Sequence, residues 1–302
     1  MTHAIEINNL HKSYGRNEAI LRGLTVSVPR GAVYGLLGRN GSGKTTCLRT
    51  LMGLLPADSG QARVLGADMW LAARGERARV AYVSQDLRLF PELTLAEHLD
   101  YVEALYGRFD RPLSVELMER FGLGSAGYIS ALSGGQQRMA AILMALCSPA
   151  EVLLFDEPTA GLDPSARRRF LEACSARLAD QPQTTILLST HLMSDLERLA
   201  THVGFLENGV IDRSEDLVEL QEYAQRFQII FPPEGPPTDL VIPPSVAPKL
   251  EGQVLQFIGG KDTASFVRSA QEHPAVRVQE FPLNLEDFFV DWANTLDAGE
   301  GA

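Results

Sequence analysis

The feature that most constrains this chain is the glycine-rich segment GRNGSGKT at residues 38–45. It follows the apolar run VYGLL and precedes residues 43–54, which we interpret as a helix. Glycines at a strand-to-helix turn let successive backbone N–H groups point inward, and the following helix directs its positive end at the same place. The segment matches the pattern G-x-x-x-x-G-K-[ST] at every defined position, including Lys44 and Thr45. The sequence therefore predicts a P-loop, which binds nucleotide phosphates.

Each residue of this loop has an expected partner. Lys44 is expected to contact the β- and γ-phosphates of ATP, and the hydroxyl of Thr45 to contact Mg²⁺. The other residues expected to bind the nucleotide are Gly38, Asn40, Gly41, Ser42, Gly43 and Thr46. The alternative is a glycine-rich turn without a ligand. The strand before the loop, the helix after it and the lysine all argue against that alternative.

A second part of the same site is expected at EVLLFDEP, residues 151–158. Four apolar residues carry the chain through the interior of a sheet, and Asp156 and Glu157 follow at the end of the strand. Ligands of parallel sheets bind at this carboxyl edge. Asp156 is the predicted Mg²⁺ ligand, and Glu157 the predicted general base or orienting group for an attacking water. Adjacent carboxylates are common on surfaces, so the pair gains its meaning from the buried strand and the P-loop.

Strands and helices alternate along the first two thirds of the chain, which is typical of a three-layer α/β sandwich. Expected strands span residues 33–37, 79–83, 152–155 and 185–188, and expected helices span 95–106 and 115–121. The continuous apolar strands indicate a parallel sheet covered on both faces. Residues 5–7 and 25–28 alternate instead, as half-buried antiparallel strands do.

Residues 217–302 are expected to form a small accessory α/β domain, and residues 1–216 the main domain. The expected elements of the accessory domain are strands at 226–231, 254–258 and 276–281 and helices at 263–271 and 285–292. Its alternating apolar residues must pack against its own core, the main domain or a second copy. We hypothesise that it helps to hold two main domains together between cycles of ATP binding.

Composition narrows the possible partners. The formal net charge of −11 repels phosphate backbones, so we expect no nucleic-acid partner. Cys47, Cys147 and Cys174 lie far apart, without metal-type spacing, and are expected to be reduced and buried. The first ten residues, MTHAIEINNL, show no secretory signal pattern, and no run approaches the length of a membrane span. We expect a soluble intracellular protein that serves a membrane only through another polypeptide.

The segment LSGGQ at residues 132–136 precedes an expected amphipathic helix with Met139, Ile142, Leu143 and Leu146 on one face. Ser133 and Gln136 also satisfy a capping box, so an ordinary helix start is one interpretation. Gly134 and Gly135 argue against it, because each glycine within a helix costs about 0.8–1 kcal/mol. Two glycines here suit a backbone that a ligand must approach closely.

With LSGGQ between a P-loop and LLFDEP, the chain resembles the ATP-binding domains of ABC transporters. That resemblance extends over residues 5–212 and implies a P-loop NTPase sandwich with an antiparallel β flank and a helical subdomain. It further implies that Gln85 touches Mg²⁺ and the membrane-facing segment, that His191 contacts the γ-phosphate, that Asp163 lies in a loop at the nucleotide, and that Tyr14 stacks on adenine. For His191 and Tyr14 taken singly, surface placement and ordinary packing are the alternatives.

The resemblance also implies partners. In this family two such domains pack head to tail, and each ATP lies between the P-loop of one copy and the Ser133–Gln136 segment of the other. We expect Ser133 and the N–H groups of Gly134 and Gly135 to meet the γ-phosphate in the partner's site, with a homodimer favoured. The runs EPTAGLDP and STHLMSDLERLA are similar to ATPases of export-type systems with separate permease chains. An integral membrane permease, bound on the cytoplasmic side of the cell membrane, is therefore expected.

Two other functions are weighed against an ATPase that drives a permease. A non-transport soluble ABC ATPase, acting in translation or DNA repair, would carry two nucleotide domains or a long coiled coil, and this chain has one P-loop and neither feature. A regulatory nucleotide-binding module would have a damaged Glu157, His191 or LSGGQ, and all three are intact. Residues 86–106 are expected to dock the permease, with core filling as the alternative.

Overall fold

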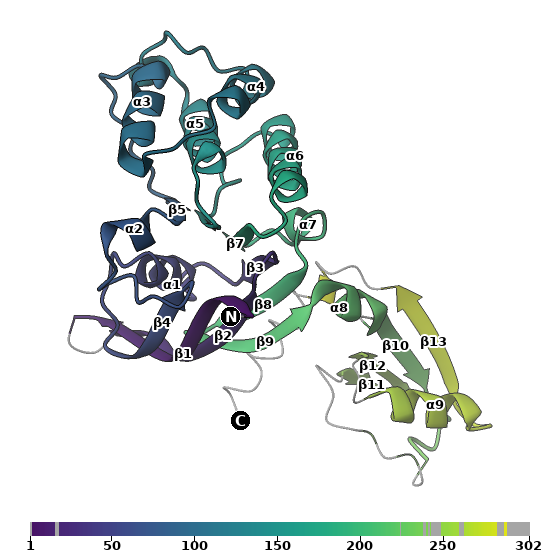
Figure 1. Cartoon of the computed structure of the whole chain (residues 1–302). Helices are drawn as coiled ribbons and strands as arrows, with labels where there is room; N and C mark the ends of the chain where they lie inside the picture. The colour runs from purple at the N-terminus through teal and green to yellow at the C-terminus, as the bar shows by residue number, and fades with distance from the viewer. Residues whose placement is uncertain are drawn as a thin grey trace. The chain divides into compact units, whose positions relative to one another are not determined.

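The computed structural model describes residues 2–15, 18–223, 225–237, 240, 242, 249–259, 263–282 and 287–288. The backbone divides into two compact units, Met1–Glu215 and Asp216–Ala302 (Figure 1). Within the described residues, the first unit contains two sheets and the second unit one, and each unit has its own buried apolar cluster. The units are therefore described separately.

The first unit is built on a six-stranded sheet in the order β5-β6-β7-β3-β8-β9. Its strands are β3 (Val33–Leu37), β5 (Val80–Val83), β6 (Val152–Asp156), β7 (Thr185–Thr190), β8 (His202–Glu207) and β9 (Val210–Asp216). The five strands from β5 to β8 in this order run parallel, and every residue of β3, β6 and β7 is buried. The predicted parallel sheet covered on both faces is confirmed.

Three further strands form an antiparallel sheet in the order β2-β1-β4: β1 (His3–Tyr14), β2 (Glu18–Pro29) and β4 (Ser59–Val64). Helix α1 (Lys44–Leu51) contributes to one apolar cluster with both sheets of this unit. On β6, Leu154 belongs to that cluster, whereas Phe155 packs edge-on against Phe170 of helix α6 (Pro164–Asp180), with ring centroids 5.4 Å apart. The two faces of β6 are thus covered by different layers, as the apolar run predicted.

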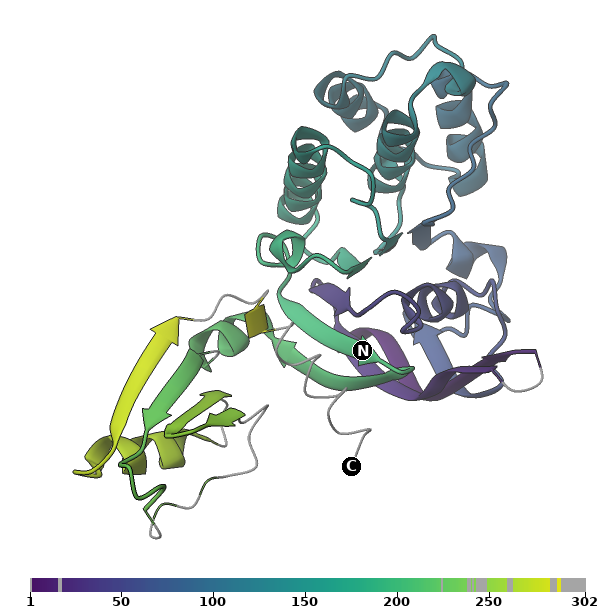
Figure 2. The same cartoon turned by 180° about the vertical axis from the view of Figure 1, so that it is seen from behind.

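The remaining helices of the first unit are α2 (Arg74–Arg77), α3 (Leu95–Tyr106), α4 (Arg111–Phe121), α5 (Gly134–Cys147) and α7 (Met193–Leu196), with a short 3₁₀ turn at Ile129–Ala131. Helices α3, α4 and α5 gather on one side of the unit and the antiparallel sheet lies at the other, in both views (Figures 1 and 2). The expected helical subdomain and antiparallel flank are both present.

Two predicted helices have different bounds. The helix expected at 43–54 ends at Leu51, because Gly53 has a left-handed φ of 71° and packs so closely that a Cβ would meet the carbonyl oxygen of Met69 at 2.3 Å. The helix expected at 115–121 begins at Arg111, because the carboxylate of Asp110 accepts the N–H of Leu113 and caps it.

Helix α5 is less amphipathic than predicted. All residues from Met139 to Cys147 are buried, rather than one face alone. Helix α5 packs against α3, α4 and α6, so its second half is enclosed on all sides. A helix of this kind is apolar all round, and the four residues assigned to one face are only part of its buried surface.

The second unit contains α8 (Leu217–Tyr223), β10 (Gln225–Ile230), β11 (Lys249–Glu251), β12 (Val254–Ile258), α9 (Ala264–Glu272) and β13 (Arg277–Pro282). Its antiparallel sheet has the order β11-β12-β10-β13. Phe227, Ile229 and Phe257 pack with Phe266 of α9 in the unit's own core. The helix expected at 285–292 lies outside the described residues except for Asp287 and Phe288, of which Phe288 is buried.

The three cysteines are free and buried, as predicted. Burial raises the pKa of the Cys47 thiol to about 12, and that of Cys147 likewise. Thiols in this state are poor nucleophiles, so they act as small apolar side chains. Among the described residues, no helix combines the length and the apolar character that crossing a bilayer demands.

Candidate functional site

The glycine-rich loop lies between β3 and α1, where the sequence placed it. Gly41 and Gly43 have φ values of 87° and 110°, in the region that favours glycine. At Gly38 a Cβ would meet the carbonyl oxygen of Leu206 at 2.3 Å. The loop borders a cavity of about 230 Å³, lined by Ile20, Asn40, Gly41, Gly43, Lys44, Thr45, Thr46, Gln85 and Glu157. Six of the eight predicted P-loop residues therefore line one cavity; Gly38 and Ser42 do not.

Lys44 is buried in this cavity, and among the described residues its ammonium group contacts loop and carboxylate oxygens. Nζ donates to the carbonyl of Gly38 at 2.7 Å and to that of Arg39 at 3.2 Å. It also lies 3.3 Å from Oε1 of Glu157, with both side chains at most 6% exposed. This last contact lacks hydrogen-bond geometry, and Oε1 has no hydrogen-bond partner within the described residues. Lys44 and Glu157 therefore form an ion pair without a hydrogen bond between them.

Asp156 ends β6 and is completely buried among hydroxyl groups. Its Oδ1 accepts from Ser189 at 2.7 Å and from Thr45 at 3.1 Å, and its Oδ2 accepts from Tyr82 at 3.2 Å. Burial, together with the neighbouring carboxylate, raises the pKa of Tyr82 far above its ordinary value, so the phenol stays protonated and donates. The sequence analysis assigned no role to Tyr82, which belongs to no recognisable motif, or to Ser189, although Ser189 begins the run STHLMSDLERLA.

Glu157 follows directly and has an unusual backbone, with a left-handed φ of 47°. Its N–H donates to Oγ and to the carbonyl of Ser189 at 3.0 and 3.1 Å. Its Oε2 lies 2.9 Å from Nδ1 of His191, whose side chain is 46% exposed. The structure therefore brings His191, Glu157 and Lys44 together in one chain of polar contacts, although they come from three separate segments.

Ser133–Gln136 does not line this cavity. Oγ of Ser133 accepts the N–H of Gln136, and the side chain of Gln136 accepts the N–H of Ser133, so the capping box considered as an alternative is present. Close packing does not explain why these two residues are glycines. A Cβ at Gly134 would meet nothing within 4 Å, and a Cβ at Gly135 would meet only Leu162, at 3.6 Å. Nothing in the described part of this chain requires glycine there.

Asp163 and Tyr14 also lie away from the cavity lining. Oδ1 of Asp163 accepts the N–H groups of Ser165 and Ala166 and caps α6, and these bonds hold the pKa of the carboxyl below its ordinary value. Tyr14 ends β1 and is 39% exposed. Their expected roles at the nucleotide remain predictions.

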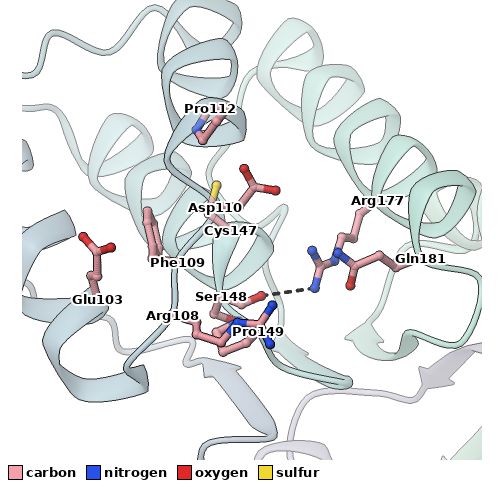
Figure 3. Close-up of a pocket in the computed structure, with 10 residues that line it drawn as sticks. All are labelled: Glu103, Arg108, Phe109, Asp110, Pro112, Cys147, Ser148, Pro149, Arg177 and Gln181. Carbon is pink, nitrogen blue, oxygen red and sulfur yellow. Dashed lines mark hydrogen bonds between the residues drawn. The ribbon is translucent and has the colours of Figure 1, made fainter.

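A second cavity, of about 450 Å³, lies where α4 begins and α5 and α6 end (Figure 3). Its buried arginine, Arg177, donates to the carbonyls of Ser148 and Ala150. These are carbonyls just past the end of α5, so the guanidinium stabilises that helix end. None of the predicted site residues lines this cavity.

A known protein family and several known proteins are similar to this chain. Residues 21–160 match the family model described as ABC transporter. Nod factor export ATP-binding protein I of Paraburkholderia xenovorans (strain LB400) is 34% identical, over 95% of this chain and 96% of the relative. The chain belongs to the ABC transporter family. It is one of the family's ATP-binding proteins and an ABC ATPase.

Other similarities agree with this assignment. ABC transporter ATP-binding protein YtrB of Bacillus subtilis (strain 168) is 29% identical, over 95% of this chain and 97% of the relative. The solved ATP-binding subunit of an ABC transporter is 28% identical, with a TM-score of 0.66, over 72% of this chain and 92% of that one. The ABC transporter cassette MJ0796, at 23% identity and a TM-score of 0.62, shares the fold. The predicted family and fold class are confirmed.

Proposed function

We propose that this ABC ATPase binds ATP with Mg²⁺ at the P-loop cavity and hydrolyses it with Glu157 as the group that polarises water. The observation that carries the proposal is the contact chain His191–Glu157–Lys44 beside the loop. One oxygen of Glu157 is held by His191, and the other is buried without a hydrogen-bond partner within the described residues. An oxygen in this state is an acceptor for a proton of the attacking water.

Lys44 supplies the positive charge for the phosphates. In the structure its donors are occupied by the carbonyls of Gly38 and Arg39. Phosphate oxygens carry more charge than carbonyls and make stronger hydrogen bonds, so ATP replaces these contacts. The N–H groups of the loop and of the first turn of α1 complete the phosphate site.

The chemistry of the donors fits Mg²⁺. Thr45 and Asp156 lie 3.1 Å apart through Oγ1 and Oδ1, and Gln85 lines the same cavity. Hydroxyl, carboxylate and amide oxygens are the ligands that Mg²⁺ prefers, and it usually takes only one or two carboxylates together with substrate phosphates. Bound Mg²⁺ would neutralise charge on the phosphate oxygens. We assign Thr45, Gln85 and Asp156 to it.

The active form is proposed to be a head-to-tail dimer. Gly134 and Gly135 are glycines without a steric reason inside the described chain, and Ser133 and Gln136 are exposed beside them. A second copy that brings its nucleotide against this helix start would need bare backbone N–H groups there. We favour a homodimer, with Asp163 and Tyr14 also contributing to nucleotide binding.

The partner is proposed to be a separate membrane permease, which holds the chain on the cytoplasmic side of the membrane. The segment after Gln85 exposes a small aromatic cluster: Phe90 is 49% and Tyr101 47% exposed, with their rings 5.8 Å apart. Exposed aromatic clusters are typical of protein interfaces. Export is favoured because relatives along the length of the chain are named for Nod factor export.

The proposal is tested by the ATPase activity of the purified full chain. We expect activity that requires Mg²⁺, is lost in EDTA, and rises per molecule with protein concentration, since each site needs two copies. Activity at fixed Mg²⁺ and ATP would be measured over a wide range of protein concentration. Turnover per molecule that does not depend on concentration would contradict the dimer, and turnover that persists in EDTA would contradict the metal assignment.

The second unit offers a separate prediction. Its apolar strand residues are covered by its own core, so they do not themselves require a partner. Strand β9 belongs to the first unit's sheet and includes Ser214, which bonds Tyr34 at 2.8 Å, so a truncation belongs after Glu215. We expect residues 1–215 to bind ATP with unchanged affinity but to associate less in the absence of nucleotide. Sedimentation with and without ATP measures association, and equilibrium binding measures ATP affinity. Unchanged association would exclude the hypothesis that residues 217–302 help to hold two main domains together.

A further inference from the structure

Arg138 connects the loops that follow β5 and β6 at the edge of the sheet. It lies in the first turns of α5, and its Nη1 donates to the carbonyl of Glu157 while Nη2 donates to the carbonyl of Gln85, each at 2.9 Å. These two residues follow the neighbouring strands β6 and β5, which pair in parallel. The planar guanidinium fork presents its donors in a fixed geometry, so it sets the separation of the two carbonyls.

The contact is not an ordinary surface ion pair. Burial lowers the pKa of Arg138, against the opposing influence of Asp156, Glu157 and Asp86. Among the described residues, no carboxylate lies within ion-pair distance of its guanidinium. The guanidinium of Arg138 is partly desolvated and donates to two backbone carbonyls. We interpret its role as holding those two carbonyls in place.

The backbone of Glu157 needs such support. A left-handed φ at a residue with a Cβ costs about 1–2 kcal/mol, and such a conformation persists only where its surroundings impose it. Ser189 holds the N–H of Glu157, and Arg138 holds the carbonyl. The direction of the carboxylate depends on both anchors, because the side chain leaves the backbone between them.

We propose that Arg138 is a positioning residue for ATP hydrolysis, which holds Glu157 in its left-handed conformation and ties it to Gln85 and to the helix that begins at Ser133–Gln136. The inference rests on the proposed role of Glu157. Arg138 itself does not line the cavity. Its loss should therefore impair turnover rather than ATP binding.

The test compares three variants of the full chain by steady-state ATPase kinetics. We expect Arg138→Ala to lower kcat by about 10- to 100-fold, as misplacement of a reacting group does, with KM for ATP changed less than about threefold. Arg138→Lys should be intermediate, because an ammonium group lacks the fork that spans both carbonyls. Arg168→Ala is the matched control, since Arg168 pairs with Glu172 on the exposed side of α6. A kcat within twofold of the unmodified chain, or a rise in KM alone, would overturn the proposal.

A double variant separates this inference from the proposed function. If Arg138 acts through Glu157, then Arg138→Ala should lower turnover further by less than about twofold in a Glu157→Gln background. The same large factor in both backgrounds would show that Arg138 acts independently, and the inference would fail. Near-normal turnover of Glu157→Gln alone would instead remove the proposed function. Where Arg138→Ala lowers the melting temperature below the assay temperature, Arg138→Lys is judged by the same two criteria.

Discussion

Glu157→Gln is expected to abolish steady-state ATP hydrolysis while ATP still binds. An amide is nearly the same size as a carboxylate, so the contact with His191 can persist, and the backbone N–H of residue 157 can still donate to the hydroxyl of Ser189. The amide cannot take up a proton, and loss of a general base lowers turnover by about 10²- to 10⁴-fold. Turnover would be measured by phosphate release at saturating ATP.

The structure also predicts how Glu157→Gln affects the affinity for ATP. Oε1 of Glu157 lies 3.3 Å from Lys44, so the carboxylate attracts the ammonium group that is proposed to bind phosphate. Removing that charge leaves Lys44 free for ATP and removes repulsion with the γ-phosphate. ATP affinity should therefore equal or exceed that of the unmodified chain, and the variant should accumulate as an ATP-dependent dimer in sedimentation.

The control variant for this prediction changes a different carboxylate. Glu172→Gln removes another carboxylate, which pairs with Arg120 and Arg168 and does not line the cavity, and it should hydrolyse ATP normally. Turnover of Glu157→Gln near that of the control would exclude Glu157 from its proposed role. Loss of ATP binding would show instead that the carboxylate helps to hold the nucleotide.

The positions of the motifs could be predicted because the carboxyl ends of parallel strands meet at one edge of a sheet. Val33–Leu37, Val152–Asp156 and Thr185–Thr190 are fully buried strands that pair in parallel, so the polar residues at and after their carboxyl ends lie at the same edge of the sheet. Lys44 and Asp156 were for this reason expected close together, whereas His191 was assigned to the site through the resemblance to the ATP-binding domains of ABC transporters. Local patterns and one topological rule were sufficient for that part of the site.

The contacts that single residues make could not be predicted in this way. The two bonds of Arg138 depend on how α5 lies against the loops after β5 and β6, which no local pattern encodes. The burial of Met139–Cys147 on all sides depends on three neighbouring helices. The start of α4 was missed for a different reason: Asp110 is a capping residue whose signal the sequence does contain.

Lys44→Ala is expected to abolish ATP binding, and also to destabilise the ligand-free protein. From the sequence alone, Lys44 is a charge whose only partner is the nucleotide, and its loss should cost the empty protein little. The structure corrects this expectation, because Lys44 is 6% exposed and is held by contacts with Gly38, Arg39 and Glu157 of the protein itself. Its removal takes away the cation that lies 3.3 Å from Oε1 of Glu157, an oxygen that is buried.

The size of the effect follows from that loss. A buried polar group that loses its partner costs about 1–3 kcal/mol, which corresponds to a fall in Tm of about 2–12 °C for a domain of this size. His191 still contacts Oε2 of Glu157 and limits the cost. ATP affinity would be measured by equilibrium binding, and Tm by differential scanning calorimetry without nucleotide.

A second substitution distinguishes the two roles of Lys44. In the variant that carries both Lys44→Ala and Glu157→Gln, the uncompensated charge is absent, so Tm should recover most of the loss while ATP binding stays absent. Lys12→Ala is the matched control, because Lys12 is also a largely buried lysine paired with one carboxylate, Asp58, at 2.8 Å. It should lower Tm without reducing ATP affinity, and Glu157→Gln should not restore its stability. If Lys44→Ala binds ATP as the unmodified chain does, the assignment of the P-loop is wrong. If its Tm is unchanged, the buried contact with Glu157 contributes nothing to the ligand-free fold.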